Sequence, residues 1–141
     1  MGLALAAALL CGRLAVAGEN WPQFRGPGGQ GLSNERGVPS RWGGPDQENV
    51  RWKTALPANI NNPFSSPIVW GDKVVITTAK DKPPREQHVL CYRLSDGAAL
   101  WDTPVPLGPW KGGSNNGYPT PATDGRDLCG LRIGGHRRTR F

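Results

Sequence analysis

After residue 17, apolar residues occur in short runs that are separated by Gly, Pro and charged residues. The run 67–70 ends at Gly71-Asp72 and is followed by the β-branched segment 74–78, so the pair predicts a β-hairpin. Residues 88–94 and 98–101 predict two further strands, joined by a turn at 95–97. The charged, proline-containing stretch 79–87 predicts a loop between the two pairs. Because no window after residue 17 has helical periodicity, the pattern predicts an all-β fold.

The sequence has an internal repeat of about fifty residues. Residues 52–57 align with 101–106 at an offset of 49, and residues 66–72 align with 120–126 at an offset of 54. The residues at equivalent positions are Trp52 and Trp101, Pro67 and Pro121, and Gly71 and Gly125. Four short strands per repeat, joined by tight turns, are typical of a β-propeller blade. The repeat therefore predicts about two four-stranded blades, with chance similarity between Pro-, Gly- and Trp-rich segments as the alternative.

The protein has six tryptophans although only 37% of its residues are hydrophobic. Trp52, Trp70 and Trp101 each lie near the end of an apolar or strand-like run. A large flat side chain in that position buries much apolar area, so we expect these three rings to pack between neighbouring blades. A platform on which a ligand stacks is the alternative.

Residues 1–17 form an Ala/Leu-rich run that ends in Ala15-Val16-Ala17. These small residues are typical of a signal-peptidase site, so we expect a secretory signal peptide with cleavage after Ala17. No Lys or Arg precedes the run, and a short buried helix is the alternative. Gly12-Arg13 interrupts the run well before the roughly 20 residues that a transmembrane span requires. We therefore predict no transmembrane span and a mature protein that is periplasmic or secreted.

The net charge of +6 is concentrated outside the predicted blades. Residues 18–125 contain eleven Lys or Arg and ten Asp or Glu, whereas residues 126–141 contain five Arg and one Asp. Nucleic-acid binding is disfavoured, because the body is nearly neutral and we expect it to be exported. After Gly125 another strand is due, but the Arg- and Gly-rich residues 126–141 fit neither a strand nor a cap. We predict a basic tail there, either genuine or the product of an out-of-frame coding sequence.

The most specific motif is Trp21-Pro22-Gln23-Phe24-Arg25-Gly26-Pro27, which opens a Gly-rich stretch. In this motif, in its repeat and in the segment 89–106, the protein resembles the pyrroloquinoline-quinone-like (quinoprotein-type) β-propeller repeat proteins. The resemblance is closest to an exported bacterial group whose mature sequences open with Trp-Pro-x-Phe-Arg-Gly-Pro. Arg93 and Ser95 depart from that family's repeat, which favours Asp and Thr there. The resemblance covers residues 20–125.

The resemblance implies a ring of more blades than 141 residues supply, so the protein would be an N-terminal fragment that does not function alone. It implies an exported propeller that acts as a binding or scaffold module for a protein or cell-surface partner. The alternative is the N-terminal part of a quinone-dependent dehydrogenase, which would use pyrroloquinoline quinone and calcium. No catalytic residue or metal ligand can be assigned, because Asp96 and Asp124 lie beside Gly in turns, where backbone hydrogen bonding explains them.

The Cys and His residues form no metal or redox motif. Cys91 and Cys129 follow residue 17, and the sequence leaves open whether they pair. His88 and His136 stand alone in the sequence, so we expect both at the surface. The Gly-rich segment 26–31 follows no strand and opens no helix, so we expect a tight turn there rather than a phosphate site.

Overall fold

The computed structural model describes residues 18–57, 65–80, 86–106, 119–132 and 135–140, and in these ranges the protein is mostly β. Its strands are β1 (Ile68–Trp70), β2 (Lys73–Lys80), β3 (Glu86–Arg93), β4 (Ala99–Pro106), β5 (Ala122–Thr123), β6 (Asp127–Arg132) and β7 (Gly135–Arg140). The helical element of this part is a single 3-10 turn, η1 (Pro27–Gly29). No helix among the described residues is long and apolar enough to cross a membrane. The expected signal peptide, residues 1–17, lies outside the described residues.

Strands β1 to β4 form an antiparallel sheet in which each strand pairs with the next one along the sequence. Gly71 has a φ of 57° in the β1–β2 turn, and Gly97 has a φ of 72° in the β3–β4 turn. Side chains are strained in this left-handed region, so glycine allows both turns to be tight. Both predicted strand pairs and both predicted turns are confirmed.

The sequence predicts a loop at residues 79–87, and this prediction is wrong at both ends, where the first two and the last two residues belong to strands. Ala79 pairs with Gln87 and Lys80 pairs with Glu86, so β2 and β3 each extend two residues into it. An antiparallel ladder satisfies backbone N–H and C=O groups whichever side chains it carries, so charged residues continue the strands beyond the apolar run.

Strands β5, β6 and β7 form a second antiparallel sheet, so the prediction that the residues after Gly125 form no strand is wrong. The Asp124 carboxylate starts the β5–β6 turn, because its Oδ1 accepts hydrogen bonds at 2.9 Å from the N–H groups of Arg126 and Asp127. The turn then places Leu128 in the core with 4% of its surface exposed. Burial of Leu128 orients the described part of β6, and this signal is weak in a sequence segment that is rich in Arg and Gly. Whether the segment is read out of frame concerns the gene and stays a prediction.

The main core joins the two sheets. Ile68, Val75 and Cys91 of the first sheet cluster with Leu128 of β6, and partly buried Val89 and Trp101 pack against them. A second cluster on the opposite face of the first sheet consists of Leu90 and Tyr92, with Val74 and Ile76 against them. Because successive residues of a strand point to opposite faces, the first sheet is apolar on both sides.

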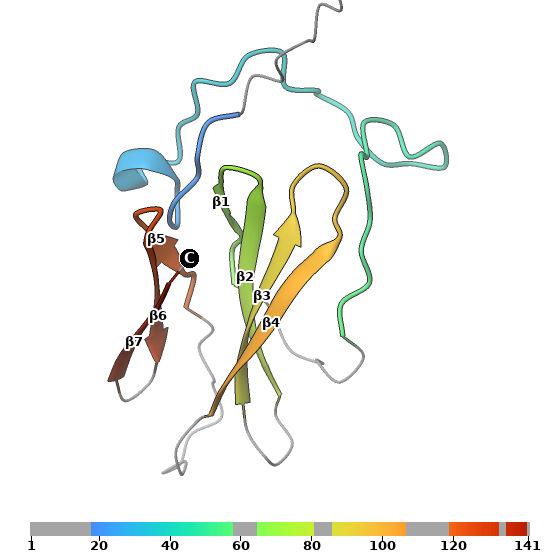
Figure 1. Ribbon diagram of the computed structural model, residues 1–141. Helices are drawn as coiled ribbons and strands as arrows, with labels where there is room; N and C mark the ends of the chain where they lie inside the picture. The colour runs from blue at the N-terminus through green and yellow to red at the C-terminus, as the bar shows by residue number, and fades with distance from the viewer. Residues whose placement is uncertain (1–17, 58–64, 81–85, 107–118, 133–134, 141) are drawn as a thin grey trace, which may run out of the picture.

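The N-terminal part of the described structure, residues 18–57, arches over one end of both sheets without forming a regular strand (Figure 1). It returns to the sheets at isolated points, one of which is an antiparallel bridge between Trp21 and Val69 of β1. Figure 1 also shows that β5–β7 lie beside the edge of the first sheet that β1 forms. This arrangement leaves the N-terminal motif at the junction of the two sheets.

Candidate functional site

Three tryptophan rings each lie against a glycine in a turn. The pairs are Trp21 with Gly26, Trp52 with Gly97, and Trp70 with Gly125. A methyl group on Gly26 or Gly125 would lie 2.5 Å from the nearest ring atom and almost as close to two of that ring's other atoms, so the ring presents its face. All three glycines have a positive φ, at 68°, 72° and 88°. Glycine is therefore required at each position for two reasons: the backbone has a positive φ, and the ring leaves no room for a Cβ.

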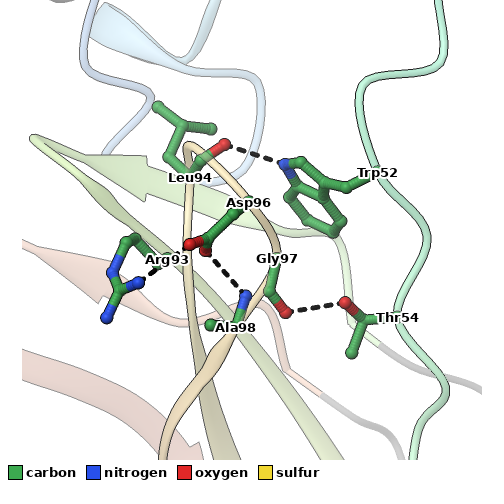
Figure 2. Close-up of polar contacts among 7 residues, drawn as sticks. All are labelled: Trp52, Thr54, Arg93, Leu94, Asp96, Gly97 and Ala98. Atoms are coloured by element: carbon green, nitrogen blue, oxygen red, sulfur yellow. Dashed lines mark hydrogen bonds and ion pairs between the residues drawn. The ribbon is translucent and has the colours of Figure 1, made fainter.

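Trp52 precedes the first sheet in the sequence and touches the β3–β4 turn (Figure 2). Its indole Nε1–H donates a hydrogen bond to the Leu94 carbonyl at 2.8 Å. The Thr54 hydroxyl donates to the Gly97 carbonyl at 2.6 Å in the same turn. The side chains of Trp52 and Thr54 thus attach the arch to the first sheet, and Thr54 is a contact that the repeat did not predict.

Trp70 connects the two sheets, and Trp101 packs on the core that they share. Trp70, at the end of β1, lies over Gly125 of the β5–β6 turn. Trp101 of β4 is half-buried and packs on the cluster that contains Leu128. These rings serve as packing surfaces in the described structure.

The repeat-related prolines and glycines occupy matching places in the two sheets. Pro67 directly precedes β1 as Pro121 precedes β5, and Gly71 follows β1 as Gly125 follows β5. Their surroundings differ, because Pro67 is exposed and Pro121 fully buried, and because Gly71 has open space where Gly125 meets a ring. The two sheets therefore share the positions of these residues relative to the strands, whereas the burial and neighbours of each residue differ between the sheets.

Trp21 and Pro22 connect the first strands of the two sheets, β1 and β5. The backbones of Trp21 and Val69 exchange two hydrogen bonds of 2.8 and 2.9 Å. The N–H of Thr123 in β5 donates to the Pro22 carbonyl at 2.9 Å. Strand β1 has β2 on one side only, so this segment covers part of its open edge and ties it to the second sheet.

Two polar contacts beside this junction involve residues that sequence reasoning missed. The N–H of Gly71 donates to Asn20 Oδ1 at 2.7 Å, and the hydroxyl of Thr77 donates to the Pro119 carbonyl at 2.8 Å. Thr77 is 1% exposed, and a hydroxyl on a buried strand face needs a partner. That rule could have marked Thr77 as a contact residue, whereas nothing in the sequence marks Asn20.

The remainder of the motif forms the tight turn that the sequence predicts. The N–H of Gly26 donates to the Gln23 carbonyl at 2.9 Å, and the N–H of Gly31 donates to the Arg25 carbonyl at 2.7 Å. Pro27 begins η1. Two side chains of the motif, Phe24 and Arg25, point into solvent, and the Arg25 guanidinium lies over the Phe24 ring at 5.5 Å from its centroid.

The acids of the turns hydrogen-bond to backbone, as the sequence predicts. Asp96 Oδ1 accepts from the N–H of Ala98 at 3.0 Å, and its Oδ2 accepts from Arg93 at 2.8 Å (Figure 2). The Ala98 N–H, and after it Arg93, holds the pKa of Asp96 below its usual value. The N–H groups of Asp127 and Arg126 lower the pKa of Asp124 in the same way.

His88 is buried, so the expectation of a surface position is wrong. It is 4% exposed, and its Nδ1 lies 2.7 Å from Asp102 Oδ1 on β4. His88 shares the face of β3 that carries Leu90 and Tyr92, and Asp102 is a neighbour only across the sheet, which the sequence does not reveal. Burial, and secondarily Asp102, raises the pKa of Tyr92. The side chain of His136 lies outside the described residues.

Cys91 and Cys129, the cysteines of the described residues, are free thiols. Leu128 points into the core beside Cys91, so Cys129, the next residue along β6, points away and is exposed. Burial raises the pKa of the Cys91 thiol to about 11.

In the part of the protein that the structure describes, no group of three or more His, Cys, Asp or Glu side chains could hold a metal ion. A calcium site that supports a quinone needs several converging oxygen ligands, and the described residues do not assemble such a set. Comparisons with protein-family models, with curated proteins and with solved structures gave no match.

Proposed function

We propose that this protein is the N-terminal part of an exported, quinoprotein-like β-propeller repeat protein that acts as a binding or scaffold module. The observation that carries the proposal is the pair of antiparallel sheets related by the internal repeat. Their first strands, β1 and β5, both hydrogen-bond to the Trp21–Pro22 segment. Neighbouring blades of a propeller are related in this way around a common centre.

The shared core supports the same proposal. The apolar face formed by Ile68, Val75 and Cys91 receives Leu128 of the second sheet, and Trp70 lies on the turn at Gly125. In a repeat architecture each unit buries its apolar face against the next one rather than within itself. The second apolar cluster, around Leu90 and Tyr92, gives the first sheet an apolar face toward its other side as well.

The contacts of three aspartates support a binding role rather than a catalytic one. The carboxylates of Asp96 and Asp124 accept hydrogen bonds within their own turns, and Asp102 contacts His88. These acids are engaged in the fold rather than directed at a common point. Exposed positions in the arch, such as Phe24, Leu32 and Trp42, remain accessible to a partner.

Export is tested by producing the full-length protein in a bacterium and fractionating the cells. We expect the protein in the periplasm or the medium, beginning at Gly18 by mass spectrometry. Retention of residues 1–17 on a cytoplasmic product would contradict the exported part of the proposal.

The dehydrogenase alternative is tested by titrating the mature protein with pyrroloquinoline quinone in the presence and absence of calcium chloride. The binding-module proposal predicts no saturable quenching of tryptophan fluorescence. Calcium-dependent, saturable quenching would favour the dehydrogenase.

A further inference from the structure

Phe24 and Arg25 stand out in the N-terminal motif because their side chains take no part in its packing. Trp21, Pro22 and Gly26 contact the sheets or the turn, whereas Phe24 is 57% exposed and Arg25 is exposed. An exposed phenylalanine beside an exposed arginine contributes nothing to the core. Their contact with each other, 5.5 Å from guanidinium to ring centroid, orients them as one unit.

Backbone strain at Arg25 points in the same direction. Among the described residues, three that are not glycine have a positive φ, namely Arg25 at 61°, Gln47 at 54° and Asn49 at 55°. The Gln47 and Asn49 side chains hydrogen-bond to the Gly44 and Arg41 carbonyls, so they contribute to their own turn. Arg25 makes no such bond within the described residues, although glycine would relax its backbone. A strained residue with an exposed, unbonded side chain is typical of a functional position.

The charge around Arg25 indicates the kind of group that it would bind. Arg25 is the one charged residue between positions 20 and 33, and no carboxylate of the described residues lies within ion-pair distance of it. The nearest acid along the sequence, Glu19, is held by the Ser33 hydroxyl at 3.1 Å and the Asn34 N–H at 3.0 Å. A single cation suits one carboxylate better than a polyanion, which needs several positive charges.

The guanidinium carbon of Arg25 lies over the Phe24 ring, and no hydrogen bond to the described residues occupies the N–H groups along the guanidinium edge. This edge matches a planar carboxylate through two parallel hydrogen bonds. The exposed part of the Phe24 ring offers apolar contact to a side chain next to that carboxylate.

We propose that Phe24 and Arg25 form a preorganised recognition pair for one carboxylate of a protein partner, at the junction of the two sheets. The carboxylate comes from an Asp or Glu side chain or from the partner's terminal carboxyl group. The inference rests on the proposed binding role and specifies its partner chemistry.

The test is an NMR titration of the mature protein that follows the Arg25 Nε–Hε and Gly26 amide signals. One probe is acetyl-Gly-Leu-Glu-Gly-amide, compared with its Gln analogue, and the other is acetyl-Gly-Leu-Gly with a free terminal carboxylate, compared with its amide. We expect saturable shifts with at least one acid and binding about tenfold or more weaker for its neutral analogue. The acid that binds identifies the source of the carboxylate.

Variants separate recognition from folding. Arg25→Gly and Arg25→Asn should abolish the shift of Gly26 while leaving the urea midpoint unchanged or higher, because both residues tolerate a positive φ. Arg25→Lys should weaken binding, because it keeps the charge and loses the planar fork. Arg36→Gly, which removes another exposed arginine of the arch, is the matched control and should bind normally.

Equal binding of an acid and its neutral analogue would overturn the inference. So would shifts produced only by inorganic phosphate or by a single-stranded oligonucleotide, or a fall in the urea midpoint of both Arg25→Gly and Arg25→Asn. If the unmodified mature protein bound neither acid while its Trp–Gly contacts were intact, this inference alone would be refuted and the proposed fold would stand.

Discussion

Gly125 has no Cβ, and both its turn and its contact with Trp70 depend on that absence. Its φ of 88° favours glycine, and the Trp70 ring occupies the space where a side chain would begin. Gly71 is at the equivalent turn of the first sheet, with a φ of 57° and open space around it. The two glycines therefore separate the cost of strain from the cost of displacing a ring.

We expect Gly71→Ala to lower the free energy of unfolding by about 1–2 kcal/mol, which is the strain of a left-handed alanine. Gly125→Ala should cost about 1–3 kcal/mol more, because the methyl group forces the Trp70 ring to move. Urea unfolding followed by tryptophan fluorescence measures both. Equal losses for the two variants would mean that Trp70 does not lie on Gly125.

The two thiols of the mature protein should differ sharply in reactivity. Cys129 is exposed, whereas burial raises the pKa of Cys91 to about 11 and so removes the reactive thiolate at neutral pH. With Ellman's reagent at pH 8 we expect one fast-reacting thiol in the native protein and two in denaturant. Cys129→Ser should remove the fast one, and a fast reaction that persists in this variant would place Cys91 at the surface.

The turn at Asp124 should make stability depend on pH. The N–H groups of Asp127 and Arg126 lower the pKa of Asp124 in the folded protein, so its contribution is present above the ordinary carboxyl pKa near 3.8 and is lost as the pH falls through the folded value. We expect the urea midpoint to fall over that acid range, and to fall less steeply in Asp124→Asn. Asp46→Asn removes an exposed aspartate and serves as the control, and identical slopes for the two variants would contradict the assignment.

At the scale of elements, the segment around Trp21 acts as a short additional strand beside β1. It satisfies the Val69 N–H on the open edge of the first sheet, and its Pro22 carbonyl receives the Thr123 N–H of the second. Asn20 adds a hydrogen bond to Gly71 at the end of that edge. Part of the open edge of β1 and of β5 is thereby covered by the protein itself, which limits pairing with other molecules.

Hydrogen exchange tests this arrangement. The amides of Val69 and Thr123 should be protected although both lie at sheet edges, because each donates to the segment. Asn20→Ala removes one anchoring bond and should speed exchange of both amides, whereas the Val75 amide within the sheet should keep its protection. Unprotected Val69 and Thr123 amides in the parent protein would show that the segment does not pair.

The elements that the sequence predicted correctly are those with local signals. Val74–Thr78 is β-branched, and the turn glycines Gly71 and Gly97 each have an aspartate beside them, so the first sheet follows from adjacent residues. Strand β6 was missed because its apolar residues do not alternate with polar ones and because Gly and Arg surround them.

Contacts between residues that are distant in the sequence could not be predicted from the sequence. Nothing local pairs His88 with Asp102, or Trp21 with Val69, because these contacts depend on how strands are placed side by side. The repeat did single out Trp52 and Gly125, whereas which ring meets which glycine follows only from the packed structure.

At the scale of the whole molecule, the account depends on two sheets that hold together through a shared core and through rings on turns. Leu128 joins the core of the first sheet, Trp70 reaches the second sheet, and Trp52 fastens the arch to the first. If these contacts are formed together, three glycines far apart in the sequence experience the same environment. Of the three contacts, Trp70 with Gly125 reports on the packing of the two sheets, whereas the other two report on the arch and on its attachment to the first sheet.

The most direct measurement is the set of Hα chemical shifts in a mature protein labelled with ¹³C at glycine Cα. A proton over an indole face is shifted upfield, so we predict upfield Hα signals for Gly26, Gly97 and Gly125, each of which reverts when Trp21, Trp52 or Trp70, respectively, is replaced by leucine. Gly28 and Gly37, which have positive φ but no heavy atom near the position of a Cβ, should stay at ordinary values. Ordinary shifts for all five glycines would contradict the account.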